Sequence, residues 1–156
     1  MKFYVDQSLG KLIKWLRLLG FDTVPVRLSQ QRPAQLPPWQ PGVYFLTRQT
    51  SWPARHVRPD LLILTSQDAE DQLAEICQRL HLAPETWQPL QRCSDCNLPL
   101  RPLPPEQLED RVPDYIAVRH QHFFECPQCH RVFWEGSHQR RIRRRLEELS
   151  HRQIHR

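Results

Sequence analysis

The sequence lacks a long apolar run. No window approaches the roughly 18 uninterrupted apolar residues that a membrane-spanning helix needs, so we do not expect a helical membrane protein. A secretory signal peptide is also not expected, because the first six residues, Met-Lys-Phe-Tyr-Val-Asp, are typical of a short β-strand. The sequence therefore predicts a soluble, cytoplasmic protein.

Glycine is scarce and proline is abundant. Four glycines stand against fifteen prolines in 156 residues. The prolines cluster at 33–41 and 99–105, where we expect loops or seams. No internal repeat is visible. The length fits one domain of average size, or a compact domain with a small appended module.

Strand-like and helix-like patterns alternate over the first 85 residues. A helix is predicted from Ser8 to Gly20, since apolar residues recur there at helical spacing. A second helix is predicted after Ser66, its expected N-cap. Between Arg27 and Gly42 the prolines exclude a full helix. Strands alternating with helices indicate a parallel α/β sheet. The β-prone runs are Lys2–Val5, Thr23–Val26, Val43–Thr47 and Leu61–Leu64.

The five cysteines are divided between two roles. Four form two Cys-x-x-Cys pairs, Cys93 with Cys96 and Cys126 with Cys129, separated by 29 residues. Two such knuckles place four thiolates around one tetrahedral ion, so we predict a structural zinc site; two disulfides or unrelated redox dithiols are the alternatives. The insert between the pairs is expected to add a hairpin or a short helix. Cys77 is expected to pack in the core.

Positive charge is concentrated at the C-terminus. The net charge is +5, and residues 137–156 alone contain seven Arg and two Glu, so the rest of the chain is neutral overall. A closing helix is predicted over Ser137–Leu149, with Ile142, Leu146 and Leu149 on its apolar stripe. A localised basic stripe favours a polyanionic partner.

Three segments together resemble one known family. They are FYVDQSLGKLIKWLRLLGFDT at residues 3–23, FLTR at residues 45–48 and FECPQCHRVFWEGSH at residues 124–138. The sequence is similar to the Mut7-C ribonuclease domain over nearly its whole length. That resemblance implies a PIN-like three-layer α/β/α fold fused to a zinc ribbon, and a role in metal-dependent RNA cleavage.

The resemblance also implies where catalytic acids should lie. Carboxylates at the end of the first strand, soon after the second strand and just after FLTR would hold one or two Mg²⁺ or Mn²⁺ ions. Asp6 fills the first place. The second falls near residues 27–36, which contain no acid, and the third falls on Gln49. The possible substitutes are Asp22, Asp60 and Asp68.

Basic and aromatic residues are candidates for contacts with RNA. Lys11, Lys14 and Arg17 recur every third residue on the first predicted helix and, with Trp15, are expected to form an exposed basic face. Arg48 ends the FLTR segment. The closing helix adds the remaining candidates: Arg140, Arg141, Arg144 and Arg145.

These patterns predict a PIN-like α/β domain over 1–90, a zinc ribbon over 91–136 and a basic helix and tail over 137–156. The favoured function is RNA binding by a nuclease-derived protein with weak or lost cleavage. One alternative is an active Mg²⁺- or Mn²⁺-dependent ribonuclease that uses Asp6 with substitute acids. The other is an adaptor whose arginine helix binds an acidic protein.

Overall fold

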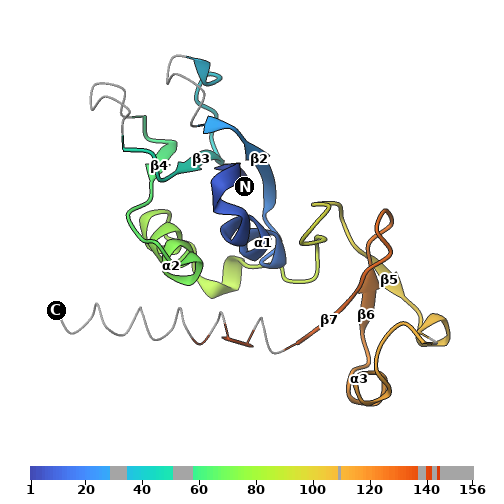
Figure 1. Ribbon diagram of the computed structural model, residues 1–156. Coiled ribbons are helices and arrows are strands. Elements are labelled where there is room, and N and C mark those ends of the chain that lie inside the picture. Colours follow the sequence, from blue (N-terminus) through green and yellow to red (C-terminus); the bar gives the residue numbers. More distant parts are fainter. Residues whose placement is uncertain (29–34, 51–57, 109, 137–139, 142–143, 145–156) are drawn as a thin grey trace.

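The computed structural model describes residues 1–28, 35–50, 58–108, 110–136, 140, 141 and 144. Its main sheet has four parallel strands in the order β2-β1-β3-β4 (Figure 1). Each strand agrees with a β-prone run of the sequence, and the predicted parallel α/β arrangement is confirmed. The strands are β1 (Lys2–Asp6), β2 (Asp22–Val26), β3 (Val43–Thr47) and β4 (Leu61–Ile63).

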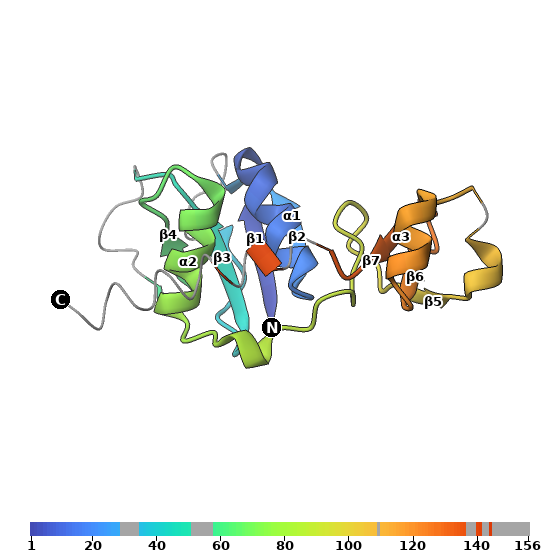
Figure 2. The same ribbon diagram turned by 90° about the horizontal axis from the view of Figure 1, so that it is seen from below.

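Two helices lie side by side against one face of this sheet (Figure 2). A 3-10 turn η1 (Gln7–Leu9) leads directly from β1 into α1 (Gly10–Leu18), and α2 (Ala69–Arg79) follows β4. The prediction that Ser66 caps α2 is wrong. The N-cap is Asp68, whose carboxylate accepts a hydrogen bond from the backbone N–H of Glu70 at 2.8 Å.

The core follows the alternation of side chains along the strands. On the helix side, Phe3, Val5, Leu46 and Leu62 pack against the apolar stripe of α1 and α2, together with Cys77. On the opposite side lies a smaller cluster of Leu28, Leu36, Phe45 and Leu61. Leu28 and Leu36 come from the proline-rich connection between β2 and β3, so this connection contributes apolar side chains to the second face.

Residues 91–136, here called the ribbon module, form a second sheet. It is antiparallel, in the order β5-β6-β7. The insert between the two cysteine pairs contains both a strand pairing and a short helix, as predicted. The elements from α2 onward are η5 (Pro84–Thr86), β5 (Arg101–Leu103), η6 (Pro105–Gln107), α3 (Asp114–Arg119), β6 (Phe123–Glu125) and β7 (Val132–Trp134).

The predicted closing helix lies mostly outside the described residues, including its expected stripe Ile142, Leu146 and Leu149 and the candidate Arg145. Of its predicted cations, Arg140, Arg141 and Arg144 are described, and all three are exposed. In the described part of the chain, no helix combines the length and apolar character required to cross a membrane.

Candidate metal centre and nucleic-acid interface

The two Cys-x-x-Cys segments fold into matching turns. In each, the residue after the second cysteine has a left-handed backbone: φ is 62° at Asn97 and 59° at His130. Each of these residues donates its backbone N–H to the carbonyl of the first cysteine, at 2.9 Å for Cys93 and 3.0 Å for Cys126. Asn and His are among the residues enriched in this conformation, so the local sequence favours both turns.

The four cysteine side chains of these turns form one cluster. The Sγ atoms of Cys93, Cys96, Cys126 and Cys129 all lie within 4.8 Å of one another. Cys93 and Cys129 are 3.7 Å apart at sulfur. A tetrahedral zinc with Zn–S bonds of about 2.3 Å places its sulfurs about 3.8 Å apart, whereas a disulfide requires about 2.05 Å. The geometry therefore fits a metal ion held by four thiolates, and all five cysteines are free thiols.

The thiols differ in how readily they ionise. Burial alone would raise the pKa of Cys126, but the backbone N–H groups of Cys129 and Gln128 outweigh it and lower this pKa to about 7. Burial and hydrogen bonds among the thiols raise the pKa of Cys96 to about 12. Binding of Zn²⁺ would overcome such differences, because the ion stabilises thiolates and displaces their protons.

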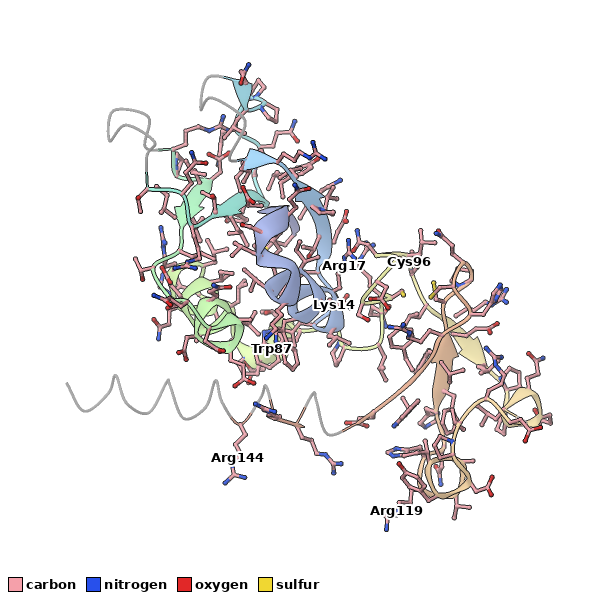
Figure 3. The ribbon with its side chains drawn as sticks, in the orientation of Figure 1. Lys14, Arg17, Trp87, Cys96, Arg119 and Arg144 are labelled. Atoms are coloured by element: carbon pink, nitrogen blue, oxygen red, sulfur yellow. The ribbon has the colours of Figure 1, made fainter. Side chains whose placement is uncertain are left out.

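Arg17 connects α1 to the first knuckle. Its side chain lies between α1 and the loop that carries Cys96 (Figure 3) and is only 7% exposed. The guanidinium donates to the carbonyls of Ser94 at 3.0 Å and Asp95 at 2.6 Å, and twice to that of Thr23 at 2.9 and 3.0 Å. The prediction that Arg17 belongs to an exposed phosphate-binding face is therefore wrong. Its charge instead lies beside thiolates that, around Zn²⁺, would carry a net charge of about −2.

A second contact fixes the same knuckle to the sheet. The Asn97 side chain donates to the carboxylate of Asp22 at 2.7 Å and accepts from the backbone N–H of Thr23 at 3.1 Å. The Asp95 carboxylate pairs with Lys14 of α1 at 2.9 Å and also with Arg131 of the second knuckle. The cysteine cluster is thus held against the start of β2 and the side of α1.

The candidate catalytic carboxylates lie at two opposite edges of the parallel sheet. Asp6 ends β1 and Asp68 follows β4, at the C-terminal edge, whereas Asp22 begins β2 and Asp60 immediately precedes β4. At about 3.3 Å per residue, the two ends of a five-residue strand are separated by about 13 Å. The structure therefore does not bring Asp22 or Asp60 to Asp6. Asp60 is fully buried and binds Arg58 through contacts of 2.9 and 2.6 Å.

The carboxylates of Asp6 and Asp68 each accept a hydrogen bond from a backbone N–H at the start of a helix. The Asp6 carboxylate is 3% exposed and accepts from the N–H of Ser8 at 3.0 Å, while Asp68 caps α2. Gln49, which stands where the third acid was expected, donates its backbone N–H to the Thr47 hydroxyl at 3.1 Å. Over the described residues, the four cysteines form the one group of three or more His, Cys, Asp or Glu side chains with metal-binding spacing.

The remaining basic candidates divide between two regions. Lys11, Lys14 and Trp15 line a cleft between α1 and the ribbon module, and Arg140 and Arg141 line it too. Arg48 is exposed just after β3, at the C-terminal edge of the sheet. Sequence reasoning missed the cleft residues that the ribbon module supplies, because no local motif marks them: Tyr115, Arg119, Arg131 and Trp134.

The structure defines a class of protein in which a parallel α/β unit is joined to an antiparallel module whose four clustered cysteines could hold a metal ion. A family model described as the Mut7-C RNAse domain matches residues 1–146 of the chain. The protein belongs to the Mut7-C RNAse domain family, and the resemblance stated from the sequence is confirmed. No match was found among curated proteins or among solved structures.

Proposed function

We propose that this protein binds RNA and that its metal-dependent cleavage is weak or lost. The observation that carries the proposal is the absence of acids at the edge of the sheet where a nuclease of this family would need them. Residues 23–59 contain no Asp or Glu at all. This stretch includes the ends of β2 and β3 and every connecting residue after them, so Asp6 has no acidic neighbour from either adjacent strand.

Magnesium requires more than this edge offers. The ion is held by carboxylates together with substrate phosphates and water, and one carboxylate seldom suffices. The acids near the end of β4 are engaged with the backbone: Asp68 is the α2 cap, and Glu75 accepts from the N–H groups of Thr65 and Ser66 at 3.1 and 3.3 Å. The same acid-free stretch contains five arginines, at positions 27, 32, 48, 55 and 58. Of these, Arg27 and Arg48 are exposed just after β2 and β3, at the edge where the acids were expected, whereas Arg58 pairs with Asp60 at the opposite edge. Exposed cations in place of acids favour phosphate binding over metal binding.

Exposed cations on the helical side support RNA as the partner. The Lys14 side chain is 60% exposed and that of Arg141 is 69% exposed. Arg141 pairs with Glu70 at 2.9 Å, but an ion pair this exposed contributes only about 0–1 kcal/mol. A phosphate can therefore replace Glu70 as its partner at little cost.

Cleavage and binding of one labelled RNA test this proposal. With Mg²⁺ or Mn²⁺ present, we expect no cleavage above that of the Asp6→Asn variant. We also expect RNA affinity to fall steeply with salt, by about 0.7 units of log affinity per log salt for each neutralised phosphate of a single strand. Metal-dependent cleavage that Asp6→Asn abolishes would instead identify an active ribonuclease. No affinity for RNA at low salt would contradict the proposal. The remaining alternative would then be an adaptor that binds an acidic protein.

Gln49→Asp provides a second test of the catalytic part. This substitution supplies one of the missing acids, yet the region near residues 27–36 still lacks the others. We therefore expect Gln49→Asp to remain inactive with either metal ion. Strong cleavage by this variant would show that two carboxylates suffice here and that the site is nearly intact.

A further inference from the structure

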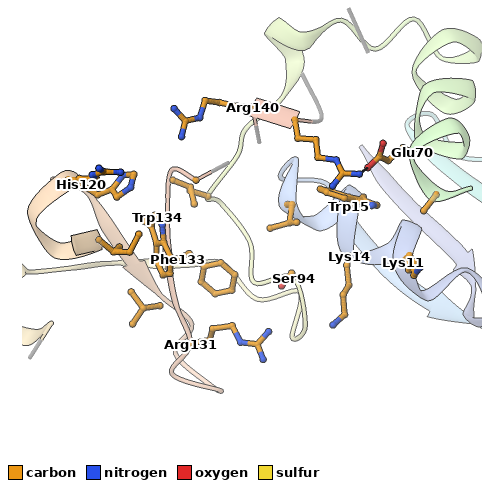
Figure 4. A pocket seen from close by; sticks show the side chains of 18 of the residues that line it. Lys11, Lys14, Trp15, Glu70, Ser94, His120, Arg131, Phe133, Trp134 and Arg140 are labelled. Atoms are coloured by element: carbon orange, nitrogen blue, oxygen red, sulfur yellow. Dashed lines mark ion pairs between the residues drawn. The ribbon is translucent and has the colours of Figure 1, made fainter. Parts of the chain in front are cut away.

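A cleft of about 1250 Å³ runs between the helical face of the α/β unit and the ribbon module. Figure 4 shows Lys11, Lys14 and Trp15 of α1 on one side and Arg131, Phe133 and Trp134 of the ribbon module on the other. Its volume exceeds the roughly 300–1,000 Å³ typical of small-molecule pockets. The cleft therefore has room for a segment of a polymer.

The charge of the cleft is strongly positive. Six cationic side chains line it, against the two acids Asp68 and Glu70. Within the described part of the chain, the side chains of Lys11, Arg119 and Arg140 have no hydrogen-bond or ion-pair partner. Lys14 and Arg131 share the single carboxylate of Asp95. This surplus of unneutralised cations favours a polyanionic ligand.

Aromatic rings stand between these cations. Trp15 is half-buried and packs on the core of the α/β unit, so its position is fixed while it also lines the cleft. Trp134 is half-buried and packs with Phe123, at 6.5 Å between ring centroids. Tyr115 of α3 is 62% exposed. Rigid or exposed rings beside cations are the combination that binds bases and backbone of an unpaired strand.

We propose that this cleft binds single-stranded RNA, with bases stacked on Trp15 and Tyr115 and phosphates held by Lys11 and Arg119. This inference rests on the proposed RNA binding and adds the strandedness of the ligand and its location. The cleft lies on the helical side of the sheet, and its lining residues do not include Asp6 or Gln49. The lining does include Asp68, the candidate substitute acid that caps α2, so the cleft reaches the C-terminal edge of the sheet beside β4.

Stacking is the reason for preferring a single strand. Unpaired bases can be splayed out and placed on aromatic rings, whereas the bases of an RNA duplex are already stacked and paired inside the helix. Phosphates alone would be bound in both forms. Every base has an aromatic face, so we expect the cleft to bind different single-stranded sequences with similar affinity.

The decisive experiment compares one short labelled RNA alone and annealed to its complement, at the same salt. We expect the wild-type protein to bind the single strand at least about tenfold more tightly. Trp15→Leu, which keeps an apolar side chain in the core, and Tyr115→Ala should each weaken single-strand binding by roughly 5- to 150-fold. Neither variant should change duplex binding. Lys11→Ala with Arg119→Ala should weaken both and flatten the salt slope.

Matched variants outside the cleft serve as controls. Trp39, 56% exposed, and Arg79, whose side chain is 43% exposed, do not line the cleft, so Trp39→Ala and Arg79→Ala should retain the strand preference. Equal binding of single strand and duplex would overturn the inference, and so would unchanged affinity in folded, zinc-loaded Trp15→Leu and Tyr115→Ala proteins. In both cases RNA binding itself would stand. Failure to bind either RNA would instead contradict the proposed function.

Discussion

Replacement of Arg17 by alanine should loosen the contact between the ribbon module and the α/β unit. The guanidinium is buried and donates to three carbonyl oxygens, those of Thr23, Ser94 and Asp95. Thr23 belongs to β2, while Ser94 and Asp95 lie inside the first knuckle. This one side chain therefore connects the sheet to the first knuckle. Alanine has no N–H groups in its side chain, so the three carbonyls would lose these donors.

The expected loss follows from the hydrogen bonds. A bond to a charged donor contributes about 1.5–3 kcal/mol, and a buried acceptor left without a donor costs about 1–3 kcal/mol. The bonds to Thr23 and Ser94 are buried, whereas the one to Asp95 is partly exposed and accessible to water. Counting only the charged hydrogen bonds to the two buried carbonyls, at about 1.5–3 kcal/mol each, Arg17→Ala should lower the free energy of unfolding by about 3–6 kcal/mol.

Lys14→Ala is the matched control on the same helix. Lys14 also reaches the first knuckle, through an ion pair of 2.9 Å with Asp95, but its side chain is 60% exposed. Exposed pairs contribute about 0–1 kcal/mol, so this variant should remain close to wild type. Arg17→Lys keeps the charge with fewer donors, so its stability should fall between that of wild type and Arg17→Ala.

Urea denaturation of the zinc-loaded proteins measures these differences. Tryptophan fluorescence in a Trp134→Phe background reports the α/β unit, because Trp134 is the single tryptophan of residues 91–136 and Trp15 and Trp87 belong to the core cluster of the α/β unit. A chromogenic chelator reports zinc release. We expect zinc to be released at lower urea than the main unfolding transition in Arg17→Ala, and together with it in wild type. The reasoning is refuted if folded Arg17→Ala loses no more stability than Lys14→Ala.

Three further outcomes are expected. Gly20→Ala should be strongly destabilising in a thermal melt, because Gly20 has φ +93° and a Cβ there would collide with the carbonyl oxygen of Gln88. Gly42 has φ +76° and open space around it, so Gly42→Ala should lower the melting temperature only through backbone strain. An equal loss of melting temperature in both variants would contradict this. Metal analysis should find about one zinc per chain, and chelation should expose residues 91–136 to protease before residues 1–90; freshly reduced protein without zinc would contradict it. Burial alone would raise the pKa of Asp22, but the hydrogen bond from Asn97 and the positive charges of Lys2 and Arg92 together outweigh it, so the pKa lies below its usual value. The stabilisation by this contact should thus be present above about pH 4 and lost on further acidification, and the Asp22→Asn variant should show a shallower acid limb in its stability–pH curve; an unchanged limb would show that this carboxylate is not coupled to folding.

Local patterns were sufficient for the elements and the metal site. The spacing of Leu9, Leu12, Ile13, Leu16 and Leu19 predicts the buried face of α1, because one face of a helix repeats every three to four residues. The clustering of the four cysteines was predicted for a similar reason. A Cys-x-x-Cys turn is closed by hydrogen bonds among adjacent residues, so its geometry depends little on the rest of the chain.

The prediction that Arg17 shares an exposed face with Lys11 was wrong for two reasons, one in helix geometry and one in packing. Each residue turns an α-helix by about 100°, so a series with a spacing of three moves around the helix, and residues six apart point about 120° apart. Lys11 therefore lines the cleft, whereas Arg17 faces the first knuckle. The rotation follows from the sequence alone. The knuckle that buries Arg17 does not, since Ser94 is 77 residues further along the chain.

The sequence by itself determined the parallel sheet, the cluster of four cysteines and the scarcity of acids, because each depends on residue types and short spacings. Which residues line the cleft was decided by the tertiary structure alone. Lys11 and Trp15 face Tyr115 and Arg131 only because Arg17 and Asn97 hold the first knuckle against α1 and β2. Contacts between residues so far apart in the chain depend on how two separately folded sheets dock, and no local pattern records that arrangement.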